Sequence, residues 1–299
     1  MLLDTPSLYF RAFFGVPDSL TAPDGSPVNA VRGLLDFIAR LVTDRGPSHL
    51  VACMDADWRP AFRVQAIPSY KAHRVAYGHE EQVPDALSPQ VLVIEQVLDA
   101  LGLVQFGVAG YEADDVIGTL ATSATMPVDV VTGDRDLFQL VDDERGVRIL
   151  YTARGVGRHE VVDEATVTRK YGIPGRAYAD FATLRGDPSD GLPGVPGVGD
   201  KTAAALVTRY GSLDSLLDAL DAGDAAMPAG ARTKLAAARD YLAVAPAVVA
   251  VAKDVPLPSY DDALPTAPRD PDRLVELSER WGLDSSLNRV LAALAAART

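Results

Sequence analysis

The sequence predicts an α/β protein in which a largely parallel sheet is covered by helices on both faces. Three short apolar runs have the length and composition of buried strands, at residues 1–3, 49–54 and 128–132. Segments with helical periodicity lie between them, at residues 28–42 and 90–101. Each run is followed by an acidic residue. Because ligands gather beyond the carboxyl ends of parallel strands, we expect these acids to meet at one edge of the sheet.

The composition excludes several classes of protein. The 299 residues are 48% hydrophobic, which is typical of a folded chain. The sequence has no apolar stretch of the roughly 18 residues that a membrane span needs, and its first residues lack a signal-peptide pattern, so we expect a cytoplasmic protein without a membrane partner. The single cysteine, Cys53, excludes an internal disulfide, and the four histidines show no zinc-ligand spacing. Any bound metal is therefore expected to have oxygen ligands.

The acidic residues of interest form five clusters along the chain. The three strand-ending clusters are joined by one at the start of a helix and one in a turn. Acids also favour both of those settings for local reasons, through the helix dipole and through turn geometry, so neither cluster is decisive alone. In chain order the clusters are Asp4, Asp55, Glu112 with Asp114 and Asp115, Asp134 with Asp136, and Asp187 with Asp190.

The basic residues are distributed unevenly in a chain of net charge −13. Residues 58–74 carry three arginines and a lysine but no acid, with three aromatic side chains between them, and residues 145–159 carry four arginines and no acid. Such strips are either solvated faces or a track for phosphates. The overall charge alone would argue against a nucleic-acid partner, but these strips keep that class open.

A glycine- and proline-rich segment, GLPGVPGVGDKT, occupies residues 191–202 and precedes a predicted helix that ends near Tyr210. Glycines at the start of a helix let a phosphate approach the free N–H groups, and Lys201 adds charge, so the segment is a candidate phosphate site. It is not a Walker A loop, and a simple hinge is the alternative. Residues 243–271 are predicted to form a connector before a final helix that begins near Asp272.

Together these clusters resemble the 5′ nuclease family, which includes the N-terminal domain of bacterial DNA polymerase I, phage 5′ exonucleases and flap endonucleases. The resemblance covers roughly residues 1–245. It implies a PIN-like nuclease core with a helical arch over residues 1–180. It further implies an α-helical, helix-three-turn-helix DNA-binding subdomain and C-terminal helices over residues 181–299. No polymerase domain follows, so a free-standing, monomeric enzyme is expected. The most specific segments are LLDTPSLYFRAFF, FRVQAIPSYKAHR, GYEADDVIGTLA, TGDRDLFQLV and GDPSDGLPGVPGVGDKTA.

The resemblance also implies roles for individual residues. Lys71 and Arg74 are expected to contact the scissile phosphate as catalytic residues, Tyr70 to stack on a base, and Arg11 and Arg63 to assist DNA binding. The duplex backbone is expected at Gly197, Gly199, Lys201 and Thr202, where relatives often carry a potassium ion. Two or more Mg²⁺ or Mn²⁺ ions are expected on Asp4, Asp55, Glu112, Asp114, Asp115, Asp134, Asp136, Asp187 and Asp190.

The implied function is hydrolysis of DNA phosphodiesters by a two-metal mechanism at 5′ ends, flaps or nicks, in replication or repair. RNA primers are a further candidate substrate, and the sequence does not rank exonuclease against flap-endonuclease activity. A non-catalytic DNA-binding protein of the same fold is one alternative. A haloacid-type phosphatase is another, because Asp55 and Asp57 have its spacing, but no threonine follows at the required offset.

Overall fold

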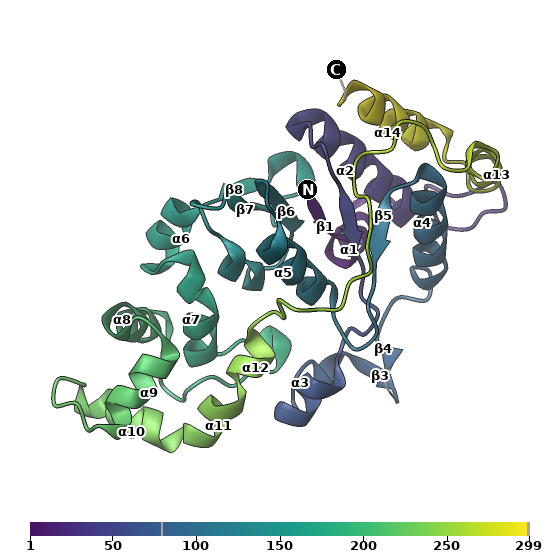
Figure 1. Cartoon of the computed structure of the whole chain (residues 1–299). Helices are drawn as coiled ribbons and strands as arrows, with labels where there is room; N and C mark the ends of the chain where they lie inside the picture. Colours follow the sequence, from purple (N-terminus) through teal and green to yellow (C-terminus); the bar gives the residue numbers. More distant parts are fainter. Residues whose placement is uncertain (79, 298–299) are drawn as a thin grey trace.

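A six-stranded sheet forms the centre of the molecule in the computed structural model, which describes residues 1–78 and 80–297 (Figure 1). The strand order is β5-β2-β1-β6-β7-β8. All neighbouring pairs are parallel except β7 with β8, so an antiparallel strand closes one edge. The strands are β1 (Leu2–Asp4), β2 (Val51–Cys53), β5 (Val104–Phe106), β6 (Val128–Thr132), β7 (Val147–Tyr151) and β8 (Glu160–Val162).

Helices cover both faces of this sheet, as the sequence predicts. Adjacent residues of β1 point to opposite sides, so that Leu2 joins one apolar core and Leu3 the other. The first core includes side chains of α5 (Ala113–Ser123) and α7 (Tyr178–Arg185). The second is built with α2 (Asn29–Arg45) and α4 (Ser88–Leu101). Burial on both faces explains why the central strands read as continuous apolar runs.

The predicted order of elements is confirmed in the core. The three apolar runs are β1, β2 and β6, and the two periodic segments are α2 and α4. The helix after the glycine-rich segment is α8 (Asp200–Tyr210). The chain between β1 and α2 forms α1 (Thr5–Gly15), and Leu8 of α1 packs into the second core.

The resemblance places the arch between about residues 71 and 89, and in the described part of this segment the structure has a 3-10 helix and a short hairpin before α4 begins. After the short helix α3 (Ala61–Ala66), a 3-10 turn η1 (Ala72–Arg74) leads into an antiparallel pair, β3 (Val75–Tyr77) and β4 (Glu80–Glu81). We call residues 75–81, as far as they are described, the β3–β4 hairpin. The β-branched and aromatic residues of β3 favour a strand. In Figure 1 the hairpin is drawn below the sheet, in the lower right part of the view.

A helical subdomain follows the sheet and is attached to it at two places. The chain leaves the sheet through α6 (Glu164–Tyr171) and α7 and returns through an extended strap, residues 250–262. In Figure 1 this subdomain occupies the lower left. Its further helices are α8, α9 (Leu213–Asp221), α10 (Ala229–Ala237), α11 (Arg239–Val244) and α12 (Pro246–Val249).

Two helices, rather than the one expected, end the chain. α13 (Pro271–Trp281) packs against α4, and α14 (Asp284–Ala296) packs against α2, so both lie on the helices that cover the sheet instead of the helical subdomain. Residues 181–299 are therefore not one spatial unit. Within residues 1–78 and 80–297, no helix is long and apolar enough to cross a bilayer.

Candidate active site

The strand-ending acids lie together at one edge of the sheet. Asp4 is the last residue of β1, Asp55 follows β2 and Asp134 follows β6; the parallel register pairs Asp4 with Cys53 and Leu3 with Val131. A cavity of about 430 Å³ opens at this edge, and we call it the reaction cavity. Its lining includes six of the nine acids expected from the sequence: Asp4, Asp55, Glu112, Asp114, Asp134 and Asp187.

Asp4 is the most deeply placed of the strand-ending acids. One carboxylate oxygen accepts a hydrogen bond from the Thr132 hydroxyl at 2.5 Å, and the other accepts from the Ser7 backbone N–H at 3.2 Å, at the start of α1. Burial raises the pKa of Asp4 to about 7, assisted by repulsion from Asp55 and Asp134. A nearby cation would reverse this effect by favouring the charged form.

The start of α5 brings two further acids to the cavity. Glu112 is the N-cap residue and forms a capping box with Asp115, which fixes both side chains relative to the first turn. Asp55 accepts a hydrogen bond from the Ala113 N–H at 2.7 Å, so it is tied to the same turn. Burial raises the pKa of Asp55 and, with repulsion from Asp4, that of Asp114. The local structure thus holds several like charges close together.

Lys71 reaches the reaction cavity from an unusual backbone conformation. Its φ is +47°, the only positive φ outside glycine among the described residues, and such conformations are strained for a side-chain-bearing residue. The Lys71 backbone N–H donates to the Asp190 carbonyl oxygen at 2.9 Å, which holds the turn. Its ammonium donates to a Glu112 oxygen at 2.5 Å. Although burial alone would lower the pKa of Lys71, the Glu112 carboxylate keeps it well above its ordinary value.

Arg63 and Asp115 are paired with each other in this structure. Arg63 is 2% exposed, and its guanidinium donates two hydrogen bonds of 2.7 Å to the two oxygens of Asp115. Asp115 is 0% exposed and also accepts from the backbone N–H groups of Glu112 and Ala252. Its two oxygens therefore have four donors. The pair is a buried structural link in this structure, so Arg63 is not placed to contact DNA and Asp115 is not placed to hold a metal.

Tyr70 is buried beside the same group of residues. The residue is 4% exposed, and its hydroxyl donates to a Glu112 oxygen at 2.7 Å. Because the ring is covered, it offers no free face to a base in this structure. Besides the capping box, the Glu112 carboxylate therefore has three side-chain partners, namely Tyr70, Lys71 and, at 3.4 Å, Arg63. Burial nevertheless raises the pKa of Glu112 to about 7.

The remaining acids, Asp136, Asp187 and Asp190, come from the segments after β6 and after α7. Asp187 lines the cavity and accepts hydrogen bonds from Ser189, whereas Asp136 and Asp190 lie just outside the lining. Arg74 donates to Asp190 at 2.8 Å and lines the cavity itself. Burial raises the pKa of Asp136, with repulsion from Asp134, and also that of Asp190. The described lining of this acidic cavity thus contains three cationic side chains, Lys71, Arg74 and Arg135.

The donor set fits a hard divalent cation. Carboxylate oxygens are the ligands that Mg²⁺ and Ca²⁺ prefer, and the described lining of the cavity offers these six acids without a competing histidine or cysteine. Within the described parts of the chain, no three such side chains already converge on a single point. The raised pKa values of Asp4 and Glu112 show that their carboxylates would gain from further positive charge nearby.

The residues of the site that were not found from the sequence include Glu81, Thr132 and Arg135, and Arg135 adds a third cationic side chain to the cavity lining. Glu81 of the β3–β4 hairpin lines the reaction cavity, and Thr132 binds Asp4. The sequence around Glu81 contains no recognisable motif, and Glu81 reaches the cavity only because strand β4 pairs with β3. Thr132 is the last residue of β6 and points to the same edge as Asp4, a position that strand register predicts.

The glycine-rich turn before α8 differs in detail from the expectation. Gly199 has φ −100°, and a Cβ added there would have no heavy atom within 4 Å, so this glycine is not needed for a left-handed turn. Gly197 and Gly194 have φ of +75° and +66°, so these two positions adopt the left-handed conformation that favours glycine. Lys201 is exposed in the first turn of α8, next to half-buried Thr202. Arg11 lies away from this turn, where it donates weakly to the Ala153 carbonyl oxygen.

Comparison with known proteins identifies the family. Residues 1–172 match the profile of the 5′-3′ exonuclease N-terminal resolvase-like domain, and residues 173–272 match that of the 5′-3′ exonuclease C-terminal SAM fold. The chain belongs to the 5′-3′ exonuclease family. A 5′-3′ exonuclease of Streptomyces coelicolor is 64% identical over 99% of this chain and 100% of its own length. One from Mycobacterium tuberculosis is 52% identical over 98% of this chain and 97% of its own.

More distant relatives have the same fold. The DNA polymerase I of Mycobacterium tuberculosis is 46% identical over 74% of this exonuclease-family chain but only 24% of its own length. The flap endonuclease-1 of Methanococcus jannaschii superposes with a TM-score of 0.64 at 14% identity, covering 100% of this chain and 93% of the other. A phage T5 5′-exonuclease with bound zinc ions superposes with a TM-score of 0.62 at 18% identity, covering 98% of each chain.

Proposed function

We propose that this protein is a structure-dependent 5′ nuclease that hydrolyses DNA at 5′ ends, nicks and flaps. The observation that carries the proposal is the reaction cavity, whose described lining brings seven carboxylates from three strand ends, one helix start, one turn and the β3–β4 hairpin together with three cationic side chains, Lys71, Arg74 and Arg135. A non-catalytic DNA-binding protein would not need this concentration of unneutralised acids, which costs folding stability. A haloacid-type phosphatase would not need the second, helical family domain.

The acids of the cavity are the proposed ligands of Mg²⁺ or Mn²⁺. Bound in pairs, such ions lower the pKa of water and neutralise the leaving oxygen of a phosphodiester. The supporting feature is the chemistry of the donors, since carboxylates are suited to hard cations. In this proposal Asp115 is omitted, and the ligands come from Asp4, Asp55, Glu112, Asp114, Asp134, Asp136, Asp187 and Asp190.

Lys71 and Arg74 are the proposed phosphate-binding residues. In this structure their charges are held by Glu112 and Asp190. A scissile phosphate entering the cavity would take over these hydrogen bonds, and the two cations would then stabilise the charge that develops during cleavage. The strained turn at Lys71 fixes where its ammonium can reach.

The helical subdomain is the proposed duplex grip. The N-terminus of α8 offers free N–H groups, and Lys201 adds a charge beside them, a combination that binds phosphate oxygens. For a potassium ion at this turn, the support is that the Gly197 carbonyl oxygen already accepts a cationic donor, the Lys234 ammonium, at 2.7 Å. We further propose that the enzyme acts as a monomer in the cytoplasm, with RNA primers as additional 5′ strands.

A cleavage assay tests this function directly. A nicked duplex carrying a labelled 5′ strand should be cut in Mg²⁺ or Mn²⁺ and should stay intact in EDTA. Asp134→Asn should abolish cutting while DNA binding is retained or becomes tighter, because the change removes a proposed metal ligand and one negative charge near phosphate. The matched control is Asp254→Asn, an exposed acid of the strap. Cleavage by Asp134→Asn at the wild-type rate in saturating metal would refute the assignment.

A further inference from the structure

Three cavities meet at one side chain of α1. Phe10 lines the reaction cavity and two larger openings beside it. One opening, of about 1250 Å³, lies under the β3–β4 hairpin, and we call it the hairpin cavity. The other, of about 990 Å³, lies between α1, α2 and the loop after β7, and we call it the arginine cavity. Phe14 borders both openings and stacks on Phe10 at 6.5 Å, so an aromatic ridge separates them.

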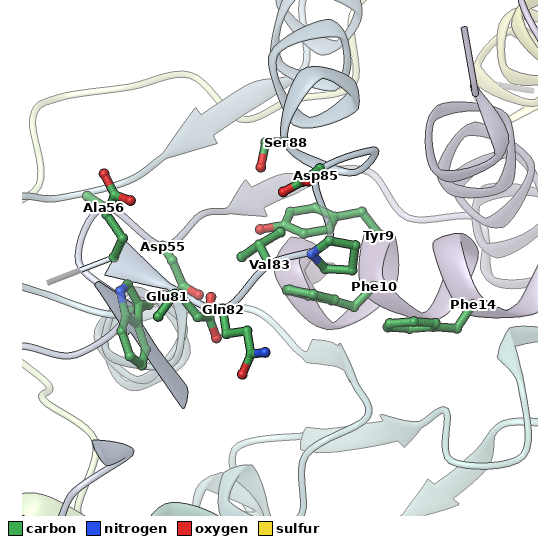
Figure 2. A pocket seen from close by; sticks show the side chains of 14 residues that line it. Tyr9, Phe10, Phe14, Asp55, Ala56, Glu81, Gln82, Val83, Asp85 and Ser88 are labelled. Carbon is green, nitrogen blue, oxygen red and sulfur yellow. The ribbon is translucent and has the colours of Figure 1, made fainter. Parts of the chain in front are cut away.

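The two openings carry opposite charges. The described lining of the arginine cavity contains four arginines and no acid: Arg11, Arg40, Arg154 and Arg158. The described lining of the hairpin cavity contains four acids and neither lysine nor arginine: Asp55, Glu80, Glu81 and Asp85. Figure 2 shows Tyr9, Phe10 and Phe14 along α1 on one side of this cavity, with Asp55 and Glu81 across from them.

This asymmetry matters because a nucleic-acid strand brings one negative charge with every phosphate. Phe10 lines both the reaction cavity and the hairpin cavity, so a base of a strand that passes from one to the other can stack on it. Glu80 and Asp85 are exposed and line the hairpin cavity but not the reaction cavity, so the next phosphates of such a strand would meet their charges. Stacking favours the first unpaired nucleotides, whereas like-charge repulsion opposes each additional phosphate.

We propose that the hairpin cavity is a charge filter that makes this enzyme disfavour long single-stranded 5′ flaps. Nicks and flaps of one or two nucleotides are the preferred substrates, because their unpaired bases end at the aromatic ridge. This inference rests on the proposed 5′ nuclease function and adds a substrate preference to it. Glu80 and Asp85 are its specificity-determining residues, since both line the hairpin cavity and neither lines the reaction cavity.

The test compares one nicked duplex with 5′ flaps of 1, 5 and 20 nucleotides at fixed Mg²⁺ under single-turnover conditions. The wild-type rate should fall as the flap lengthens. The double variant Glu80→Gln/Asp85→Asn should cut the 20-nucleotide flap roughly fivefold faster, a size expected for loss of exposed-charge repulsion, and should leave the nicked duplex unchanged. The matched control, Glu279→Gln/Asp254→Asn, removes the same charge from exposed positions outside both cavities and should change nothing.

A second substrate tests the cause without altering the protein. A 20-nucleotide flap whose outer phosphates are replaced by uncharged methylphosphonates should be cut by the wild type almost as fast as a 1-nucleotide flap. Raising NaCl should narrow the difference between short and long flaps, because salt screens exposed charges.

Several outcomes would overturn the filter. Equal wild-type cleavage rates on 1- and 20-nucleotide flaps would do so. The filter would also fail if the control variant raised the rate on the 20-nucleotide flap as much as Glu80→Gln/Asp85→Asn does, or if Glu80→Gln/Asp85→Asn raised the rate on the nicked duplex to the same extent. If no substrate is cut in Mg²⁺ or Mn²⁺, the proposed function fails; titration of the same DNAs in Ca²⁺ then decides the filter separately. In that titration, the filter is refuted if the wild type binds short and long flaps with equal affinity and the Glu80→Gln/Asp85→Asn variant binds them no differently from the wild type.

Discussion

Two neighbouring aspartates of the site, Asp114 and Asp115, have different surroundings and therefore different roles. Asp114 and Asp115 are consecutive in the chain, yet Asp114 faces the reaction cavity and Asp115 is buried against Arg63. Consecutive residues of a helix point about 100° apart, so only one of them can face the cavity. A cluster of acids in a sequence therefore contains both candidate ligands and structural anchors, and burial separates them.

The Arg63 and Asp115 pair gives a prediction about stability. Arg63→Met should lower the free energy of unfolding by about 3–5 kcal/mol, because it leaves a buried carboxylate unpaired. The double variant Arg63→Met/Asp115→Leu should recover most of that loss, since an apolar pair of similar volume can replace a buried ion pair. Urea denaturation in EDTA measures both changes.

Metal affinity provides the control for this pair. If Asp115 is only an anchor, the refolded double variant should bind Mn²⁺ about as tightly as the wild type. A large loss of Mn²⁺ affinity in the double variant, with stability restored, would return Asp115 to the set of metal ligands. Asp114→Asn serves as the comparison, because Asp114 lines the reaction cavity and its loss should weaken metal binding.

Among the elements, the turn between α7 and α8 depends on its glycines in a position-specific way. A Cβ added at Gly194 would lie 2.4 Å from the Arg185 carbonyl oxygen, and φ there is +66°. Gly199, in contrast, has a negative φ and open space around it. Sequence pattern alone marks all of these glycines as equivalent, and only the backbone geometry distinguishes them.

We therefore expect Gly194→Ala and Gly199→Ala to differ. Gly194→Ala should destabilise the protein by roughly 2 kcal/mol or more, because it combines a disfavoured φ with a backbone clash. Gly199→Ala should have little effect on stability. Thermal unfolding of both variants, followed by circular dichroism, makes the comparison. Similar melting temperatures for the two would show that the turn can adjust.

The elements also show where prediction from sequence succeeds. β1, β2 and β6 are short, apolar and followed by acids, so both their structure and their common edge could be predicted. The β3–β4 hairpin was not predicted, because its strands are only three and two residues long and give no extended alternating pattern, although Val75 and Tyr77 favour a strand. Glu81 was missed for the same reason. The burial of Arg63 and Tyr70 was missed because it depends on α12, α5 and the strap, which are distant in sequence.

At the scale of the whole molecule, the crowded acids connect folding to pH and to metal. In the folded protein the pKa values of Asp4 and Glu112 are about 7, above the values of about 4 in an unfolded chain. Between about pH 4 and pH 7, the folded state therefore binds more protons at these two carboxyl groups than the unfolded state does. Consequently, the contribution of these groups to stability is fully present near pH 4 and is lost as the pH rises through 7.

A divalent cation should offset this loss. We expect Mg²⁺ to raise the free energy of unfolding more at pH 8 than at pH 5.5, because protons compete with the metal for the same carboxylates and ligand binding stabilises only the folded state. Urea titrations in EDTA and in Mg²⁺, at equal ionic strength, measure the difference. An equal or larger effect of Mg²⁺ at pH 5.5 would contradict the assigned pKa values.

The path of the chain has a practical consequence. The helical subdomain is joined to the sheet at both ends, through α7 and through the strap, and α14 then packs on α2. A single protease cut in the turn at Gly223, between α9 and α10, would leave a fragment with the whole sheet and a fragment anchored by the strap, α13 and α14. The cleaved protein would therefore give two bands on a denaturing gel but would still elute as a single species from a size-exclusion column.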